Sequence, residues 1–200
     1  MPEQHTDPPA NLVRNYVGRD FALVRVHHKS KRPIGLQWQK SPITTEHSAI
    51  EAFRGPVNIG VLLGSASKGL IDVDIDSPEA QKFADTLLPW TKSIFGRKSK
   101  PRSHRLYRVK GTAPTEKFVD PITGTTLLEL RGDKADGTSG FQTVLPGSIH
   151  ESGEPIEWEE DDFPTVIGYE ELSKSVTRLA MRALIERYCP GITDPAQDVR

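Results

Sequence analysis

The chain has 200 residues, of which 36% are hydrophobic and 26% are charged, and its formal net charge is −1. These values are typical of a globular protein with one large domain, or with one domain and a small appendage. No apolar stretch approaches the ~18 residues of a membrane helix, the N-terminus lacks the layout of a secretory signal, and the single cysteine excludes both an internal disulfide and a cysteine-based zinc site, so we expect a cytoplasmic protein without membrane partners.

The first 55 residues are predicted to form a tail, two helices and a strand. Residues 1–10 are polar and contain prolines, and we expect a flexible tail there. "NLVRNYVGRD" indicates a short helix, residues 21–26 indicate a strand, and "KSKRPIGLQWQ" indicates a loop. "TTEHSAIEAFRG" favours a second helix that begins near a Thr or Ser and ends before Gly55.

Two apolar runs follow, "NIGVLLG" and "GLIDVDID", with the turn-like "SASKG" between them. We expect this pair to form a hairpin deep in a sheet. Side chains alternate along a strand, so Asp72, Asp74 and Asp76 share one face. Solvation, or pairing with Lys and Arg, would explain such acids on a polar edge. Inside a sheet, closely spaced carboxylates indicate cations, and Mg²⁺ prefers oxygen ligands of this kind.

The remaining elements give an α+β pattern. Ser77 as N-cap and Pro78 at the first helical position predict a helix over "SPEAQKFADTLLPW". Strands are predicted over 105–109, "TTLLELRG" and "GFQTVLPGSIH", with an edge strand over "GEPIEWEE". Apolar residues at helical spacing predict a final amphipathic helix after residue 168. We therefore expect a mixed, largely antiparallel sheet flanked by helices, with a C-terminal helix.

The charges are unevenly distributed along the chain. From residue 91 to 110 there are eight basic residues and no acid, whereas residues 151–162 hold seven acids and no base. A basic run is most often a solvated surface, but this one contains a histidine and lies between two motifs. We therefore interpret it as a candidate surface for phosphates.

Four segments, "LIDVDID", "KPRSHRLY", "LLELRGD" and "TVLPGSIH", resemble in their order and spacing the catalytic core of the bifunctional DNA primase/polymerase family. That family belongs to the archaeo-eukaryotic primase superfamily and is common in plasmid and phage replication proteins. The upstream "KRPIGLQW" is similar to the Lys-x-Pro loop and Trp with which members often open. The resemblance covers residues 12–160 and implies a primase-polymerase core with an RRM-like element.

The resemblance implies three metal-binding carboxylates. Aligning the chain on "SPEA" selects Asp74 and Asp76, although the register Asp72 and Asp74 stays open. The third carboxylate is expected to be Glu129, where many relatives have Asp, with Asp133 as the rival. With a catalytic His104, these residues would hold two Mg²⁺ or Mn²⁺ ions.

The other motifs imply contacts to the nucleotide and the template. Relatives often have Ser-x-His where Ser103 directly precedes His104, and Gly147 stands where the family usually has a second Pro. The residues expected to bind the nucleotide are Arg102, Ser103, His104, Arg105, Arg131, Ser148 and His150, and those expected to bind DNA are Lys98, Lys100 and Arg108.

The function implied is a DNA primase and DNA polymerase, a nucleotidyltransferase that uses dNTPs or NTPs on a single-stranded DNA template. The catalytic domain is expected over 11–165 and a helical extension over 166–200, leading into a longer chain that could carry a helicase. Two alternatives stay open: a metal-dependent nuclease and a non-catalytic DNA-binding module. Binding of a divalent metal would distinguish the polymerase and the nuclease, which need it, from the non-catalytic DNA-binding module.

Overall fold

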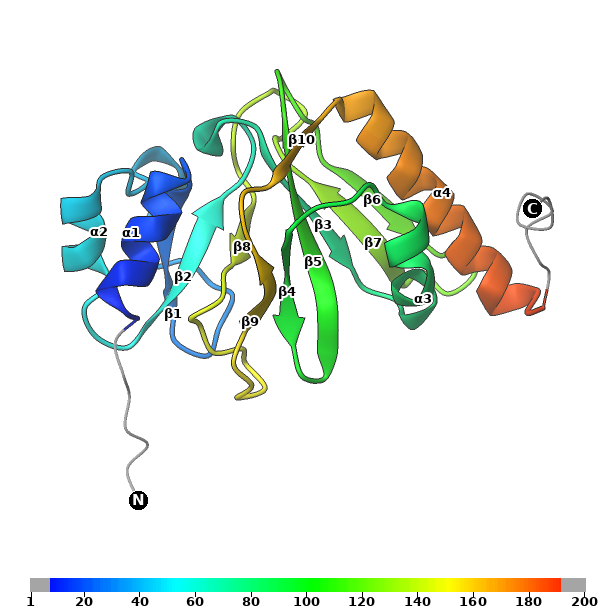
Figure 1. Cartoon of the computed structure of the whole chain (residues 1–200), viewed down its shortest axis with the longest axis horizontal. Coiled ribbons are helices and arrows are strands. Elements are labelled where there is room, and N and C mark those ends of the chain that lie inside the picture. The colour runs from blue at the N-terminus through cyan, green and yellow to red at the C-terminus, as the bar shows by residue number, and fades with distance from the viewer. Residues whose placement is uncertain (1–7, 192–200) are drawn as a thin grey trace.

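The computed structural model describes residues 8–191, which form two sheets with helices on their outer sides (Figure 1). Figure 1 shows α1 and α2 beside the smaller sheet and α3 and α4 beside the larger one. The predicted α+β fold with a C-terminal helix is confirmed. The helices are α1 (Ala10–Gly18), α2 (Glu46–Ala52), α3 (Pro78–Leu87) and α4 (Tyr169–Tyr188), and two short 3₁₀ turns span Trp38–Lys40 and Ser65–Ser67.

The strands are short and almost all pair antiparallel. Their bounds are β1 (Ala22–His27), β2 (Val57–Leu62), β3 (Leu70–Ile75), β4 (Ser93–Arg97), β5 (Lys100–Val109), β6 (Glu116–Val119), β7 (Thr126–Arg131), β8 (Gln142–Val144), β9 (Glu157–Asp161) and β10 (Thr165–Ile167). The smaller sheet has the order β1-β2-β8, and the larger has the order β6-β7-β3-β5-β4-β9. Among the strands of the described residues, β10 is the one that pairs parallel, along β5.

The predicted hairpin of β2 and β3 is wrong, because these strands lie in different sheets. β2 is buried along its whole length and has β1 on one side and β8 on the other. β3 likewise has both edges occupied, by β5 and β7. The "SASKG" segment forms a 3₁₀ turn between Gly64 and Lys68, both at positive φ, and carries the chain from one sheet to the other.

Each sheet has its own core. The apolar side chains of β1 and β2 pack with α1 and α2, and also meet Phe95 and Leu106 from the larger sheet. On the other face of β3, Ile71, Val73 and Ile75 pack against α3 and α4. The alternation along β3 therefore directs its isoleucines and valine to the helices and its aspartates toward the smaller sheet.

Local sequence signals explain where the helices begin. The side chain of Thr45 accepts a hydrogen bond from the backbone N–H of Ser48, and that of Ser77 accepts one from Ala80. Both residues act as N-caps, as predicted. The predicted tail over 1–10 lies mostly outside the described residues, and α1 begins at Ala10. The stretch 192–200 also lies outside them.

The strand predicted from residue 105 begins five residues earlier, at Lys100. β4, which was not predicted from the sequence, pairs with β5 as a hairpin, and the paired backbone extends β5 across the basic segment. Gly96 permits the tight return, because a Cβ there would lie 2.5 Å from the carbonyl oxygen of Lys100. His104 consequently lies inside a strand rather than ahead of one.

α4 packs as the sequence predicted, with Leu172, Val176, Leu179 and Ala183 buried against the second core. Near its C-terminal end, Arg187 binds both carboxylate oxygens of Glu79, at 2.9 and 2.8 Å. The helix is therefore bound to α3 by packing and by charge. None of the described helices has the length and apolar character needed to cross a membrane.

We expect Arg187→Ala to lower the melting temperature by roughly 4–8 °C. The substitution removes the pair with Glu79 and leaves the buried carboxylate of Asp120 without the guanidinium 2.6 Å away. Calorimetry or circular dichroism would measure the change. Arg178→Ala is the matched control, because it removes an exposed arginine from the same helix. Equal melting temperatures for the two variants would contradict this account.

Candidate active site

Three polar side chains form a row across the larger sheet. Asp74 on β3 lies opposite His104 on β5 and opposite Glu129 on β7. Directly paired residues direct their side chains to the same face, and this face is turned toward the smaller sheet. One neighbouring row carries Asp72 opposite Arg131. The strand pairing thus brings Asp74 next to His104, 30 residues further along the chain, and next to Glu129, 55 residues further along.

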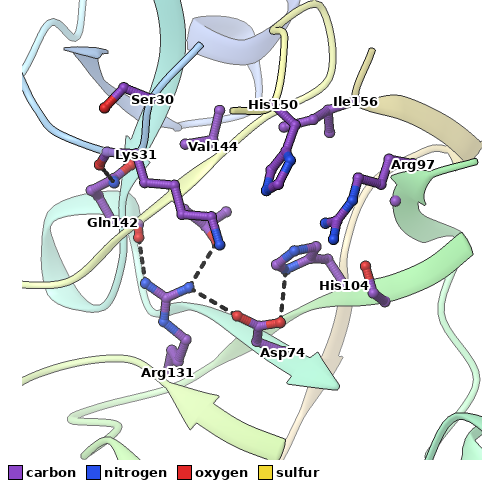
Figure 2. Close-up of a pocket in the computed structure, with 13 residues that line it drawn as sticks. Ser30, Lys31, Asp74, Arg97, His104, Arg131, Gln142, Val144, His150 and Ile156 are labelled. Carbon is purple, nitrogen blue, oxygen red and sulfur yellow. Dashed lines mark hydrogen bonds and ion pairs between the residues drawn. The ribbon is translucent and has the colours of Figure 1, made fainter. Parts of the chain in front are cut away.

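A cavity of about 270 Å³ lies over this row. Figure 2 shows Lys31 entering from one side, Arg97 and His104 from the other, and Arg131 with Asp74 at its base. The lining is rich in cations, so the cavity suits an anionic ligand. Its lining residues are Ser30, Lys31, Asp74, Gly96, Arg97, Ser103, His104, Arg131, Gln142, Thr143, Val144, His150 and Ile156.

Asp72 lies behind the cavity and is fully buried. Its carboxylate lies 3.0 Å from Nδ1 of His104 and also accepts a hydrogen bond from the Thr143 hydroxyl. Burial alone would raise the pKa of Asp72, but His104, Arg131 and the Thr143 hydrogen bond together lower it. The same burial would lower the pKa of His104, but Asp74 and Asp72 raise it. The two side chains thus form a buried ion pair.

His104 is also held from its ring face. Its ring stacks on that of Phe95, with centroids 4.7 Å apart and planes inclined by 9°. Trp158 closes the other side of Phe95, edge-on at 5.0 Å. With Asp72 at Nδ1 and Phe95 against its face, the imidazole has a fixed orientation, and its pair with Asp74 at 3.7 Å aims it at the cavity.

The three carboxylates expected to bind metal are bridged by protein cations. The Lys100 ammonium lies 2.9 Å from Asp76 and 3.9 Å from Asp74. Arg131 lies 3.4 Å from the other oxygen of Asp74 and 3.7 Å from Glu129. Two positive groups therefore occupy the spaces between three carboxylates, which is the charge pattern expected of residues suited to binding cations.

Asp72, Asp74 and His104 form a group of side chains that could hold a divalent metal ion. Ligand atoms of Asp72, Asp74 and His104 all lie within 4.8 Å of one another. Carboxylate oxygens suit Mg²⁺ and Mn²⁺, and imidazole suits softer transition metals. Asp74, Asp76 and Glu129 retain side-chain exposures of 15%, 34% and 23%, whereas Asp72 has none. The exposed carboxylates are thus the ones that a hydrated ion can reach.

Four of the residues expected to bind the nucleotide line the cavity: Ser103, His104, Arg131 and His150. Ser103 is fully buried, and its hydroxyl has no hydrogen-bond partner in the described part of the chain. Burial and the positive charges of Arg97 and Lys31 lower the pKa of His150. This histidine therefore experiences the positive potential of the cavity wall.

The structure does not bring the other three to the cavity. Arg102 pairs with Asp85 and Glu159, and Arg105 with Asp85, on the α3 side of β5. Arg102 has a positive φ of 51°, which interrupts the alternation of side chains along β5. The hydroxyl of Ser148 accepts a hydrogen bond from the backbone N–H of Ile59 and thereby ties its segment to β2.

The DNA-binding candidates are also dispersed. Arg108 donates to the backbone carbonyls of Ser67, Lys68 and Arg19, so it supports the turn between the sheets. Lys100 is engaged by the carboxylates, and Lys98 is exposed at the tip of the β4–β5 hairpin. Of the candidates for binding DNA, Lys98 alone has an exposed position.

The basic segment and the acidic segment are in part paired with each other. The acidic segment forms β9, which pairs with β4 of the basic hairpin. Arg97 lies 3.2 Å from Glu154, and Arg102 contacts Glu159. The basic run is therefore partly a partner for the acidic strand rather than a continuous surface for phosphates.

Asp133, the rival for the third carboxylate, has a structural position. One oxygen accepts hydrogen bonds from the backbone N–H and hydroxyl of Ser65, and the other accepts one from the backbone N–H of Ala113. It is fully buried below the turn that joins the sheets. Of the two candidates, Glu129 is the one beside Asp74.

Several cavity residues were not foreseen from the sequence. Lys31 and Ser30 come from the tip of the β1 hairpin, and Gln142 and Thr143 from β8. Lys31 opens the "KRPIGLQW" segment and Thr143 opens "TVLPGSIH", but neither was expected to contact a ligand, and Ser30 and Gln142 lie directly before these segments. The register of β8 on β2 is what brings them to the cavity.

One comparison with known proteins identifies a family. A model described as the N-terminal domain of the bifunctional DNA primase/polymerase matches residues 13–174 of the chain. This span runs from within α1 to the first turns of α4 and includes the whole cavity. No curated protein matches the chain.

Proposed function

The chain belongs to the bifunctional DNA primase/polymerase family, and on that premise we propose that it transfers nucleotides from dNTPs or NTPs onto a strand paired with a single-stranded DNA template. The family implies a nucleotidyltransferase with DNA and nucleotide substrates. The proposal goes further, to Mg²⁺ or Mn²⁺ held by Asp74, Asp76 and Glu129 and to a triphosphate in the adjoining cavity.

The observation that carries the proposal is the contact between a carboxylate cluster and a cationic cavity. Asp74 belongs to both, since it pairs with Glu129 across the sheet and lines the cavity floor. A ligand that is both polyanionic and metal-bound would satisfy both at once, and a nucleoside triphosphate is such a ligand. Two divalent ions bound there would activate the attacking 3′-oxygen and stabilise the pyrophosphate that leaves.

The residues of the chain have separate parts in this scheme. Arg131 is positioned by the backbone oxygen of Gln142, at 2.5 Å, and by the hydroxyl of Thr143, at 3.2 Å. Its guanidinium is thus held against Asp74, where it can neutralise phosphate charge without reorganising. His104, fixed by Asp72 and Phe95, presents its remaining nitrogen as a hydrogen-bond donor to a phosphate oxygen.

A gel assay tests the proposed function directly. The protein is incubated with single-stranded DNA, labelled nucleotides and Mg²⁺ or Mn²⁺, with and without an annealed primer. Products in the absence of primer establish a primase, and extension only with a primer establishes a polymerase. Shortened input strands would replace the proposal with a metal-dependent nuclease. Unchanged strands combined with retention of DNA would leave a binding module.

We expect Lys100→Met to increase the affinity for Mn²⁺ by about three- to ten-fold in the absence of nucleotide. The ammonium bridges Asp74 and Asp76, so an incoming ion must displace it, and its removal raises the attraction of the site for cations. Titration followed by electron paramagnetic resonance of Mn²⁺ would measure the change. Lys98→Met is the matched control, because it removes an exposed lysine from the same hairpin. Weaker Mn²⁺ binding by Lys100→Met would contradict this role.

A further inference from the structure

The hairpin that follows β1 brings a lysine to the mouth of the cavity. The backbone N–H of His27 donates to the carbonyl of Arg32, and that of Ile34 to Arg25, so residues 28–31 form the tip. Within this tip, Lys31 lines the cavity together with Ser30. In Figure 2 its side chain extends inward from the wall opposite Arg97 and His104.

The backbone of the tip is fixed by two side chains from the smaller sheet. Asn58 on β2 is 1% exposed, and its amide group donates to the carbonyl of Ser30 at 3.2 Å. Gln142 on β8 donates to the carbonyl of Lys31 at 2.9 Å. Exposed loops are often mobile. These two hydrogen bonds hold the backbone of Ser30 and Lys31 in place, so the side chain of Lys31 starts from a fixed position.

The same two side chains tie the tip to the other walls. Asn58 also donates to the carbonyl of Ile149 at 2.7 Å and accepts from its N–H at 3.0 Å, which holds the segment that carries His150. The backbone oxygen of Gln142 accepts from Arg131. Lys31, His150 and Arg131 are therefore mounted on one hydrogen-bonded frame, although they come from segments far apart in the sequence.

Of the three cationic side chains Lys31, Arg97 and Arg131 that line the cavity, Lys31 differs from the other two in having no counter-charge from the described protein. Arg131 faces Asp74, and Arg97 faces Glu154. Within the described residues, the Lys31 ammonium has neither a hydrogen-bond partner nor an ion-pair partner. Its positive charge, with that of Arg97, acts on His150. The positive charges of Lys31, Arg97 and Arg131 around one cavity favour a ligand with several negative charges.

We propose that Lys31 binds the terminal phosphates of the incoming nucleotide and thereby selects triphosphates over shorter nucleotides. The inference rests on the proposed function, since it takes the cavity as the nucleotide site. Asp74 fixes the metal-bound part of the ligand at the cavity floor, and Lys31 enters from the mouth. A lysine at the mouth contacts only a ligand long enough to extend that far, so its contribution grows with the number of phosphates.

Calorimetric titration with deoxyadenosine tri-, di- and monophosphate tests this, with Mg²⁺ and without DNA so that no transfer occurs. For Lys31→Ala we expect the affinity for the triphosphate to fall by roughly ten-fold, the loss of one charge-assisted hydrogen bond, and that for the monophosphate to change by less than about two-fold. Inorganic tripolyphosphate should displace the triphosphate from the wild-type protein and do so less well from the variant. Lys31→Arg should restore most of the loss.

Lys40→Ala is the matched control, because it removes an exposed lysine from the 3₁₀ turn that follows Lys31 in the chain and lies outside the cavity. An equal loss for all three nucleotides, or an unchanged affinity for the triphosphate, would overturn the role of Lys31 while leaving the proposed function in place. If the wild-type protein bound none of the three nucleotides, both the inference and the nucleotide cavity would be refuted.

Discussion

Asp74→Asn is expected to reduce nucleotide transfer by at least about 10³-fold while the protein remains folded. Asp74 occupies the centre of the site: it lies opposite both His104 and Glu129, and its two oxygens face Lys100 and Arg131. The amide has nearly the same shape but lacks the charge that would hold a divalent ion. Primer extension with labelled nucleotides would measure the loss.

The fold of the variant is expected to stay intact because its neighbours are already well supported. Arg131 keeps its hydrogen bonds to Gln142 and Thr143, and Lys100 keeps Asp76. The melting temperature should therefore change by only a few degrees. Glu51→Gln, an exposed carboxylate on α2, is the matched control. Full activity of a folded Asp74→Asn protein would remove the metal assignment altogether.

The sequence predicted the parts of the fold that depend on local signals. Thr45 and Ser77 cap their helices by accepting hydrogen bonds from backbone N–H groups three residues further on. In α4 the apolar residues recur at helical spacing, which predicts the face that is buried. The shared face of the three aspartates follows from alternation alone. These features are readable because each one depends on residues within one or two turns of the chain.

The pairing of β2 could not be predicted in this way. Two apolar runs joined by a short turn favour a hairpin, but β2 is buried along its whole length between β1 and β8, so neither edge remains for β3. Which strand occupies an edge depends on packing between distant segments. The same holds for β4, whose pairing with β5 places His104 inside a strand.

The sequence predicted the kind of chemistry at the candidate site better than it predicted which residues line it. Asp74, His104 and Arg131 meet at the cavity, whereas Arg102 and Arg105 turn toward Asp85 on α3. The positive φ of Arg102 is a backbone feature that a sequence motif does not show. Lys31 is the lysine of the Lys-x-Pro loop, but that motif does not show that it reaches the cavity, where hydrogen bonds from Asn58 and Gln142 hold the backbone of its loop.

Asp72 is the residue whose role the structure makes most testable. As part of the group with Asp74 and His104, it has the geometry of a metal ligand. Its burial favours another role, because the carboxylate is inaccessible and already engaged by His104 and Thr143. Displacing these partners to bind an ion would leave a buried imidazolium without its counter-charge, which is costly. We therefore expect Asp72 to position His104.

Asp72→Asn should accordingly lower nucleotide transfer by about 10²-fold while the affinity for Mn²⁺ changes by less than about three-fold. The amide can still occupy the space, but it cannot stabilise a protonated His104. Extension assays measure the first quantity and Mn²⁺ titration the second. Thr143→Val, which removes only the hydroxyl bound to Asp72, is expected to have a smaller effect on transfer.

A double-mutant cycle separates the two roles. If Asp72 acts through His104, the loss in Asp72→Asn with His104→Ala should equal the loss in His104→Ala alone, because the second change removes what the first one positions. Additive losses, together with Mn²⁺ binding as weak as in Asp74→Asn, would make Asp72 a ligand. The register of the metal-binding pair would then be Asp72 and Asp74, with the bridge between Lys100 and Asp76 lying outside the metal site.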